Sequence, residues 1–401
     1  MKWETVKLAG CCASIADGDH QPPPKVEVGV PFVTISNINS SNQFDFSNTM
    51  FVPQEYYDGL DSKRKAQAGD VLYSVVGSFG IPVLIKDNTP FVFQRHIAIL
   101  RPNERILPSF LYYTMRSSDF YAKADAAAIG AAQRTVSLSA LRNMEIALPS
   151  LETQKEIVSI LSAYDSLIEN NQKQIKLLEE AAQRLYKEWF IDLRFPGHES
   201  TPIHDGIPEG WEKTSLEEVI SFNPKYVLPK EGVKRIFPMA ALSTSSMILD
   251  WSQSELSTST SGTKFSNGDT LLARITPCLE NGKTAFVDGL LDGEVATGST
   301  EFIVMQSKAI SPYMVYLLAR SSDFRETAIN SMTGSDGRQR AQVDKLKQYS
   351  YLRPSQLIID QFGTFAAPIF MQIHALNKQN SDLQEARDRL LPILMSGEIS
   401  L

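Results

Sequence analysis

RSSDF, at residues 116–120, occurs a second time at residues 320–324 of this 401-residue chain. Further matches extend the similarity to both sides: Trp3-Glu4 returns as Trp211-Glu212, Gly69-Asp70-Val71-Leu72 as Gly268-Asp269-Thr270-Leu271, Gln133-Arg134 as Gln339-Arg340, and Pro149-Ser150 as Pro354-Ser355. Because matched residues lie between 199 and 208 positions apart, the copies differ mainly by loop insertions. A chain made of two similar halves is expected to have two similar sites, which favours a ligand that itself has two parts.

The composition is that of an ordinary globular protein. Apolar residues make up 43% of the chain, enough for a substantial core, and no apolar run is as long as a membrane-spanning helix. The first residues lack the apolar core of a signal peptide. Cys11, Cys12 and Cys278 are too badly spaced for a disulfide framework or a zinc site, and the five histidines form no ligand pattern. We therefore expect a cytoplasmic protein with reduced thiols and no metal.

The net charge of −7 is unevenly distributed. Residues 1–150 hold 14 basic and 14 acidic residues, and residues 209–354 hold 16 and 17. The surplus of acid lies mainly in residues 151–208 and 355–401. Proteins that bind nucleic acid usually carry a basic excess, so the near-neutral halves permit a basic face without requiring one.

Each half is expected to contain short strands and a helix. Apolar runs bounded by Gly, Pro, Asn and Asp predict strands at 31–35, 71–76, 83–85 and 96–100 in the first half and at 269–275 and 300–305 in the second. Helices are expected at 110–128 and 313–329. The Ser- and Thr-rich stretch 243–263 is expected to be a loop or an edge hairpin, and Tyr112, Tyr113, Tyr121 and Tyr316 are expected in the core.

After Pro149 the apolar residues follow a heptad pattern. Ile157, Tyr164, Asn171, Leu178 and Leu185 recur every seven residues, and Leu161, Ile168, Ile175, Ala182 and Trp189 recur four places later. The pattern predicts a coiled-coil helix that ends before Pro196-Gly197. Asn171 on this seam is expected to lower stability and to fix the register.

The second half ends in a seam of its own. It consists of Phe362, Ile369, Leu376, Leu383 and Leu390, with Ala366, Ile373, Asn380 and Leu394 alongside. Arg387 interrupts it, and Gly363, Pro368 and Pro392 weaken its ends. Because proline lacks the amide hydrogen that a helix needs, Pro368 predicts a late start or a kink.

Two such helices in one chain can bury each other's apolar faces. An antiparallel pair would place the globular halves at opposite ends, related by a pseudo-twofold axis. At about 1.5 Å per residue, a helix from Ile157 to Trp189 is about 50 Å long, which would hold two DNA readers about 13 to 15 base pairs apart. A structural hairpin unrelated to DNA fits the heptads equally well. The expected fold class is α+β, with two similar globular domains joined by two long antiparallel coiled-coil helices.

Two motifs that suggest an enzyme are incomplete. Gly282-Lys283-Thr284 matches the end of a phosphate-binding loop, but Pro277 stands where that loop needs glycine. Asn223-Pro224-Lys225-Tyr226 is similar to a motif of adenine methyltransferases, but Lys225 replaces its second proline and no glycine-rich turn precedes it to hold a methyl donor. Nucleotide binding is therefore not expected at the first motif, the second is expected to be a loop, and we expect no catalytic activity.

The ends of both halves are similar to those of a known family. Leu148-Pro149-Ser150, Thr153-Gln154-Lys155-Glu156-Ile157, Asp165, Ile168 and residues 177–190 carry the similarity, together with Leu394-Met395-Ser396-Gly397-Glu398-Ile399. The stretches 69–72, 267–272, 274–283 and 298–302 add to it. On these residues the chain resembles the specificity subunit (HsdS) of type I restriction-modification systems over essentially its whole length.

The resemblance implies a division of labour. Residues 1–150 and 209–354 would be target recognition domains, each reading one half of an interrupted DNA site. Residues 151–195 and 355–401 would be spacer helices, joined through a linker at 196–208, that set the gap and dock two modification subunits. Those subunits would bind S-adenosylmethionine and methylate adenine, restriction subunits with ATP and Mg²⁺ would complete the complex, and this chain would carry no cofactor.

The candidate DNA contacts are basic and amide side chains. Arg and Lys favour guanine and Gln favours adenine, whereas phosphate contacts only position the protein. We select Lys63, Arg64, Lys65, Arg95, Gln133 and Arg134 in the first half, and Lys264, Arg274, Lys283, Arg338, Gln339 and Arg340 in the second. The duplicated Gln-Arg pair has the best support. The alternatives are a coiled-coil adaptor that binds two copies of a protein without DNA and, less favoured, a standalone enzyme.

Overall fold

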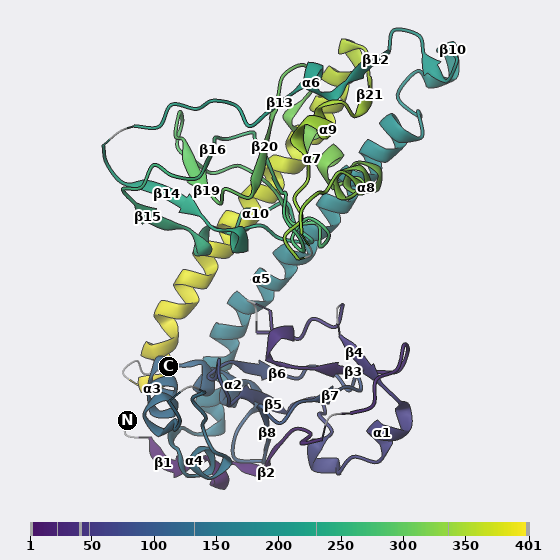
Figure 1. The fold of residues 1–401 in the computed structure, drawn as a ribbon. Helices are drawn as coiled ribbons and strands as arrows, with labels where there is room; N and C mark the ends of the chain where they lie inside the picture. Colours follow the sequence, from purple (N-terminus) through teal and green to yellow (C-terminus); the bar gives the residue numbers. More distant parts are fainter. Residues whose placement is uncertain are drawn as a thin grey trace. The chain divides into compact units, whose positions relative to one another are not determined.

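The computed structural model describes residues 3–21, 23–39, 42–47, 49–131, 133–229, 231–335 and 337–397, so Glu398 and Ile399 of the family signature lie outside the described residues. The chain divides into two compact units. Unit 1 comprises Met1–Ile168 and Asp382–Leu401, and unit 2 comprises Glu169–Ser381. Each long helix, α5 (Leu151–Tyr186) and α10 (Gln356–Ser396), contributes one part to each unit (Figure 1). The domain limits given above stay predictions.

Unit 1 is built from short strands and helices. Its strands are β1 Glu4–Lys7, β2 Cys12–Asp17, β3 Val30–Val33, β4 Met50–Val52, β5 Val71–Ser74, β6 Pro82–Leu84, β7 Val92–Phe93, β8 Ile97–Pro102 and β9 Glu145–Leu148; its short helices are α1 Gln54–Asp58, α2 Pro108–Arg116, α3 Ser118–Ala127 and α4 Leu138–Asn143. The strands form sheets in the orders β2-β8-β5-β6, β4-β3-β7 and β1-β9. Within β4-β3-β7, β3 pairs with β7 in parallel and with β4 in antiparallel.

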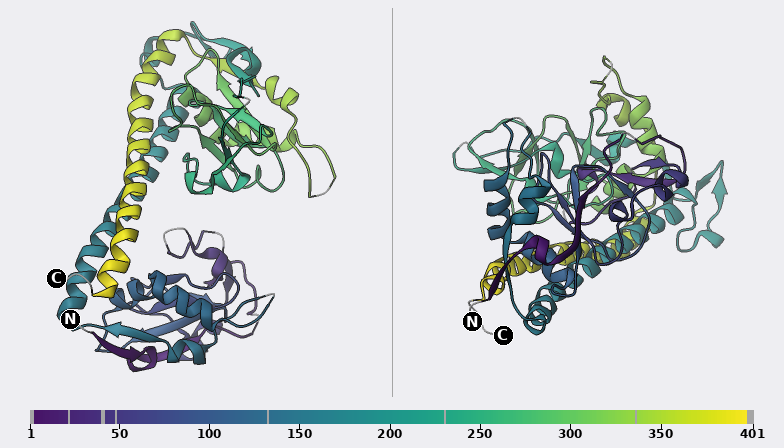
Figure 2. Two further views of the ribbon diagram at one scale, coloured as in Figure 1. Left: turned by 90° about the vertical axis from the view of Figure 1, so that its left-hand side faces the viewer. Right: turned by 90° about the horizontal axis from the view of Figure 1, so that it is seen from below.

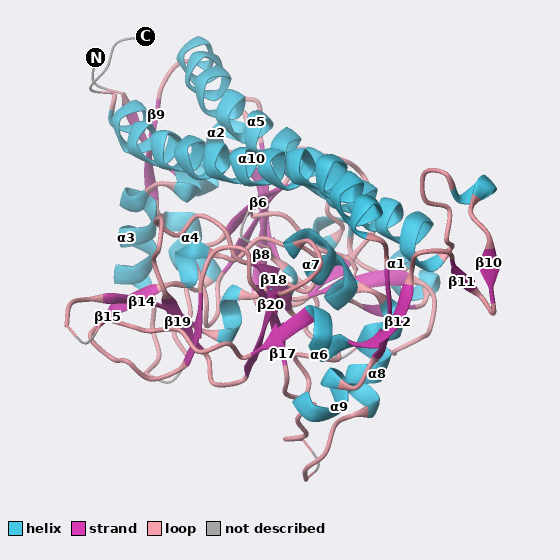
Figure 3. Ribbon diagram, turned by 90° about the horizontal axis from the view of Figure 1, so that it is seen from above, coloured by secondary structure: helices cyan, strands magenta, loops and turns pink. Residues whose placement is uncertain are grey.

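Unit 2 repeats this plan. Its strands are β10 Ile203–His204, β11 Ile207–Pro208, β12 Glu212–Ser215, β13 Ile220–Phe222, β14 Lys234–Phe237, β15 Glu255–Ser257, β16 Thr263–Phe265, β17 Thr270–Ala273, β18 Thr284–Phe286, β19 Ala296–Gly298, β20 Phe302–Ser307 and β21 Ser350–Arg353; its short helices are α6 Leu216–Val219, α7 Pro312–Arg320, α8 Ser322–Asn330 and α9 Val343–Lys347. The sheets run β13-β20-β17-β18, β15-β14-β19-β16, β12-β21 and β10-β11, drawn in magenta in Figure 3.

The duplication seen in the sequence is confirmed by the sheet topology. The order β2-β8-β5-β6 corresponds to β13-β20-β17-β18, and β4-β3-β7 corresponds to β15-β14-β19, to which unit 2 adds β16. The expected strands all occur, with ends shifted by a few residues. The Ser- and Thr-rich stretch, expected to be a loop or an edge hairpin, is mostly loop and contributes the edge strand β15, which pairs with β14.

The repeated RSSDF motif is a helix–cap–helix junction. Ser117 ends α2 and caps α3: its hydroxyl donates to the Thr114 carbonyl (2.7 Å) and accepts from the Phe120 amide (3.2 Å). Phe120 is 1% exposed in the core. Ser321 and Phe324 repeat the arrangement in unit 2. The single helices expected at 110–128 and 313–329 were therefore wrong, because a serine that caps the second helix adopts an extended backbone and ends the first.

The heptad seam of α5 is confirmed. Ile157 and Leu161 are fully buried in the core of unit 1, and Ile175 and Ala182 are buried in that of unit 2, together with Trp189 of the π-helical turn Lys187–Ile191 that follows α5. In unit 2, α5 and α10 run antiparallel and side by side (Figure 2). The buried Asn171 amide donates to the Asn380 side chain at 3.0 Å, so the polar seam position has a polar partner.

The seam of α10 differs from expectation at two residues. The helix begins at Gln356 and continues through Pro368, so the late start was wrong, and the kink expected as its alternative stays a prediction. Pro368 and Thr364 lie on the exposed side, where water can satisfy the carbonyl left without an amide partner. Arg387 does not merely interrupt the seam: it is 5% exposed and pairs with Asp165 of α5 at 2.6 Å within unit 1.

The remaining expectations concern tyrosines and loops. Tyr112, Tyr113 and Tyr316 are buried as expected, but Tyr121 is 47% exposed, because it stacks its ring on Phe79 from outside the core. The segment around Asn223 is a loop, as expected; its side chain accepts from the Val304 amide at 2.9 Å. Such a bond is structural, and it agrees with the rejection of the methyltransferase motif.

Candidate nucleic-acid interface

In unit 1, a short exposed hairpin connects α3 and α4. Ile129 and Thr135 exchange two backbone hydrogen bonds, of 3.0 and 2.8 Å. Between them Gly130 has a φ of +103°, and a Cβ there would lie 2.7 Å from the Gln133 carbonyl oxygen. This turn therefore needs glycine. Residues 129–135, of which Ala132 lies outside the described residues, are named the unit 1 tip.

Unit 2 has the same hairpin at the same place in its topology. Thr333 and Arg340 exchange backbone hydrogen bonds of 3.1 and 2.9 Å. Gly334 follows Thr333 as Gly130 follows Ile129, with a φ of +132°. Residues 333–340, of which Asp336 lies outside the described residues, are named the unit 2 tip. The duplication thus reproduces an exposed loop as well as the core.

The backbone hydrogen bonds at the base of each tip fix which residues correspond. The Arg134 carbonyl accepts from the Gly77 amide at 2.9 Å, and the Gln339 carbonyl accepts from the Thr276 amide at 3.0 Å. Arg134 and Gln339 therefore occupy equivalent positions. The matched Gln-Arg pairs are one residue out of register, because the unit 2 tip is one residue longer, and so the two arginines are not equivalent.

Three candidate side chains at the tips are available to a ligand. Gln133 and Arg338 are exposed and Gln339 is partly exposed. Among the described residues, none of the three has a side-chain hydrogen bond or ion pair. Arg and Gln are the side chains that pair with guanine and adenine edges, so these three fit direct readout.

Arg134, in contrast, already has partners within unit 1. Its guanidinium pairs with the Asp125 carboxylate and lies 5.5 Å from the centre of the Phe79 ring, which stacks in turn on Tyr121. This arrangement holds the tip against α3. Sequence reasoning identified Arg134 but missed Asp125 and Phe79, and no motif signals either.

Arg274 and Arg340 share one carboxylate in unit 2. Arg340 donates to Glu301 from Nε (3.0 Å to each oxygen) and from Nη2 (2.7 Å), and Arg274 Nε lies 3.2 Å from the same group. Hydrogen bonding from Arg340 lowers the pKa of Glu301, so this group is ionised at neutral pH. The structure thus brings together two candidates from distant segments and adds an acid that sequence reasoning missed.

The basic residues 63–65 lie at another edge of unit 1. Arg64 lies 3.7 Å from the Asp17 carboxylate, and Lys65 donates to the Asp58 carbonyl at 2.8 Å. Lys63 and Arg95 are exposed, with no side-chain partner among the described residues. These two are the candidates in this region that a phosphate group can reach without breaking a contact.

Lys283 and Lys264 differ in the same way. Lys283 donates to the Met239 carbonyl at 3.0 Å, which gives the Gly282-Lys283-Thr284 motif a structural role. Lys264, on β16, is partly exposed and has no side-chain partner in the described part of the chain. Of the twelve candidates, those with prior partners are better suited to holding loops than to reading bases.

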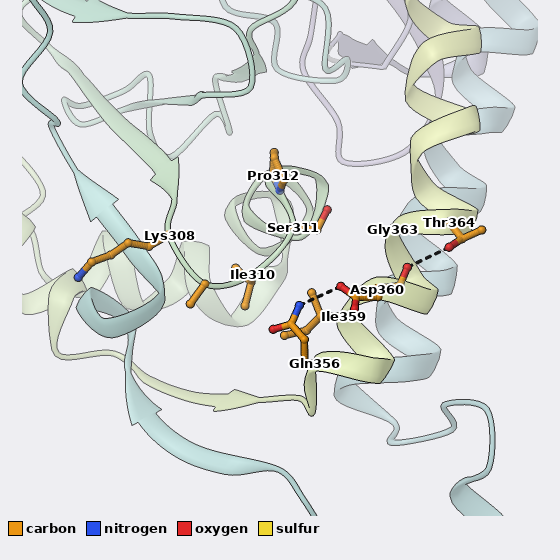
Figure 4. A pocket seen from close by; sticks show the side chains of 10 residues that line it. Lys308, Ile310, Ser311, Pro312, Gln356, Ile359, Asp360, Gly363 and Thr364 are labelled. Carbon is orange, nitrogen blue, oxygen red and sulfur yellow. Dashed lines mark hydrogen bonds between the residues drawn. The ribbon is translucent and has the colours of Figure 1, made fainter.

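An open pocket of about 590 Å³ lies in unit 2, beside the start of α7 and the first turns of α10 (Figure 4). Gln356 donates to Asp360 there at 2.8 Å. The equivalent of Ile359, which lines the pocket, is Gln154 in unit 1. Gln154 is fully buried; it accepts from the Leu107 amide and donates to two carbonyls, at 2.8 to 3.0 Å. At this pocket, unit 2 therefore lacks the buried hydrogen bonds that Gln154 makes in unit 1.

Among the described residues, no group of three or more His, Cys, Asp and Glu side chains is placed to hold a metal ion. Within the same residues, no helix is both long and apolar enough to span a membrane.

Comparisons with known proteins point in one direction. A family model described as the type I restriction modification DNA specificity domain matches residues 1–180. The MjaIX type I restriction enzyme specificity subunit of Methanocaldococcus jannaschii is 25% identical over 84% of this chain and 79% of its own length. The EcoAI specificity subunit of Escherichia coli is 34% identical over 33% of this chain and 23% of its own. The crystal structure of a type I S subunit from M. genitalium has the same fold, with a TM-score of 0.54, 14% identity, and coverage of 98% of this chain and 96% of that one.

Proposed function

We propose that this chain is a specificity subunit of a type I restriction-modification system and that it reads an interrupted DNA site with one unit per half-site. As a specificity subunit it is a non-catalytic, DNA-recognising component. The observation that carries the proposal is the duplicated tip, which lies at the same place in the topology of both units. Two exposed tips with the same backbone arrangement but different side chains suit a DNA site whose two halves differ in sequence.

The two tips offer different chemistry to DNA. The unit 1 tip presents Gln133, and the unit 2 tip presents Arg338 and Gln339. Gln pairs with adenine and Arg with guanine through two hydrogen bonds each. We therefore propose that the two half-sites differ in sequence.

The partners and cofactors follow from the family. We propose that α5 and α10 dock two modification subunits, which carry S-adenosylmethionine, and that restriction subunits with ATP and Mg²⁺ join them in the cytoplasm of a bacterial or archaeal cell. Both recognition segments are nearly neutral. Since phosphate contacts supply most non-specific affinity, we propose that the partner subunits provide much of this contact.

A matched insertion in both helices tests the spacing role. Seven residues would be added to α5 between Asn171 and Leu178 and seven to α10 between Ile373 and Asn380, on the same side of the Asn171–Asn380 contact, which preserves that pairing. One heptad adds about 10 Å, or about 3 base pairs. We expect a longer gap between unchanged half-sites, measured by sequencing methylated DNA. Altered half-site bases with an unchanged gap would refute the spacing role.

A further inference from the structure

Arg274, Glu301 and Arg340 join three segments at the base of the unit 2 tip. Arg274 follows β17, Glu301 precedes β20, and Arg340 closes the tip. The backbones are also linked: the Arg274 amide donates to the Glu301 carbonyl at 3.0 Å, and the Ala341 amide donates to the Arg274 carbonyl at 2.8 Å. The ion pairs therefore lie where the tip leaves the body of the unit.

Unit 1 has no charge at the equivalent positions. The Val75 amide donates to the His96 carbonyl at 2.9 Å, so Val75 corresponds to Arg274 and His96 to Glu301. Thr135 corresponds to Arg340, because each closes its tip against the same strand end. One fold thus holds the tip by two different means, with a charged triad only in unit 2.

The triad leaves Arg340 poorly placed to read a base. One of the edges through which the Arg340 guanidinium could pair with guanine using two donors is taken by Glu301, which accepts from its Nε and Nη2 atoms. Releasing them would break a charge-assisted, bidentate pair. Arg338 and Gln339, on the same tip, have no such competing partner among the described residues.

We propose that Glu301 is a positioning residue for DNA recognition: it holds Arg274 and Arg340 and so aims Arg338 and Gln339 at the bases of one half-site. This inference rests on the proposed function, because it needs the unit 2 tip to face DNA. It also reassigns Arg274 and Arg340 from base contacts to supports of the tip.

Two variants test the inference in the chain assembled with its modification subunits. Glu301→Gln weakens the triad, and the triple variant Arg274→Val, Glu301→His and Arg340→Thr installs the uncharged set found in unit 1. The control Asp344→Asn makes the same change of charge at an exposed ion pair of α9. The probes are duplexes with the intact methylation motif, or with one half-site scrambled, and thermal unfolding checks folding.

We expect Glu301→Gln to weaken binding about tenfold, all of it through the unit 2 half-site, as loss of one charge-assisted interaction implies. The triple variant should bind within about threefold of the unmodified chain, with an unchanged dependence on salt. If the triple variant binds as weakly as Glu301→Gln, or if its salt dependence falls by about one charge, the arginines contact DNA themselves and the inference is wrong.

Other outcomes separate this inference from the proposed function. If the unmodified complex ignores scrambling of either half-site, the proposed function fails and the inference with it. If it discriminates both half-sites but Glu301→Gln binds like the control, only the inference fails. Should Glu301→Gln not fold, Arg338→Ala decides: retained recognition of the unit 2 half-site would overturn the role given to the tip.

Discussion

The stability of unit 2 should depend on pH through one buried carboxyl group, Asp269. It is 1% exposed, and its Oδ2 atom accepts from the Tyr226 hydroxyl at 2.7 Å and from the Ser266 amide at 2.9 Å. No cation pairs with it in the described structure. Burial raises the pKa of Asp269 to about 6, because the charged form is poorly solvated.

The equivalent residue of unit 1 has a different partner. Asp70 is also 1% exposed, but Arg101 donates to both of its oxygens, at 2.9 and 2.8 Å. In unit 2 the position of Arg101 is taken by Gln306, which donates to Tyr226 instead. The two aspartates therefore form a matched pair, one with a cation and one without.

The direction of the pH effect follows from the raised pKa. A group that holds its proton more tightly in the folded state stabilises the fold fully below its unfolded pKa, near 4, and loses that contribution as pH rises through about 6. A shift of about two units corresponds to roughly 3 kcal/mol. Wild type should therefore lose up to roughly 3 kcal/mol between about pH 4.5 and pH 8 relative to Asp269→Asn, which has no proton to lose.

Urea unfolding at the two pH values measures this difference. The control Asp70→Asn leaves Arg101 without its carboxylate partner, so it should destabilise unit 1 by roughly 2–4 kcal/mol at both pH values. If wild type and Asp269→Asn show parallel pH profiles, then burial does not shift this carboxyl as described, and the reasoning is wrong.

Three further predictions concern buried links and the tips. Gln154→Leu should destabilise unit 1 by about 2–4 kcal/mol, since three buried hydrogen bonds are lost; in urea unfolding, Ile359→Met at the equivalent position should change stability by less than about 1.5 kcal/mol. Asn171→Leu should be destabilising because it leaves the Asn380 amide buried and unpaired, whereas Asn171→Leu with Asn380→Leu should restore stability. A double-mutant cycle should give a coupling free energy of about 1–3 kcal/mol between the two residues. Strictly additive effects of the two substitutions would contradict this pairing. Arg338→Ala should weaken recognition of one half-site by about 1–3 kcal/mol in competition binding, and equal losses at both half-sites would count against two separate readers.

Much of the fold could be predicted from the sequence because its signals are local or periodic. The heptads between Ile157 and Trp189 identify the buried face of α5, since only one face of a helix repeats at that spacing. The repeated RSSDF motif revealed the duplication. Its role as a junction needed the structure, because the same serine that favours a cap in one setting is tolerated inside a helix in another.

The candidate sites were less predictable, because their partners come from distant segments. Glu301 meets Arg274 and Arg340 only through the folding of two strands and a tip, and no spacing in the chain signals such a meeting. The sequence match paired Arg134 with Arg340, whereas the structure pairs Arg134 with Gln339, one residue earlier. A one-residue difference in loop length leaves the sequence match intact but moves each side chain to a different position.

The most direct test of the account is methylome sequencing of DNA from cells that express this chain with its modification subunit. The account predicts adenine methylation confined to one interrupted motif, with two unlike half-sites separated by a gap of fixed length. A continuous motif would contradict the assignment of one reader to each unit. If the complex assembles with an active modification subunit and yet methylates no specific motif, the chain is an adaptor and the central claim is wrong.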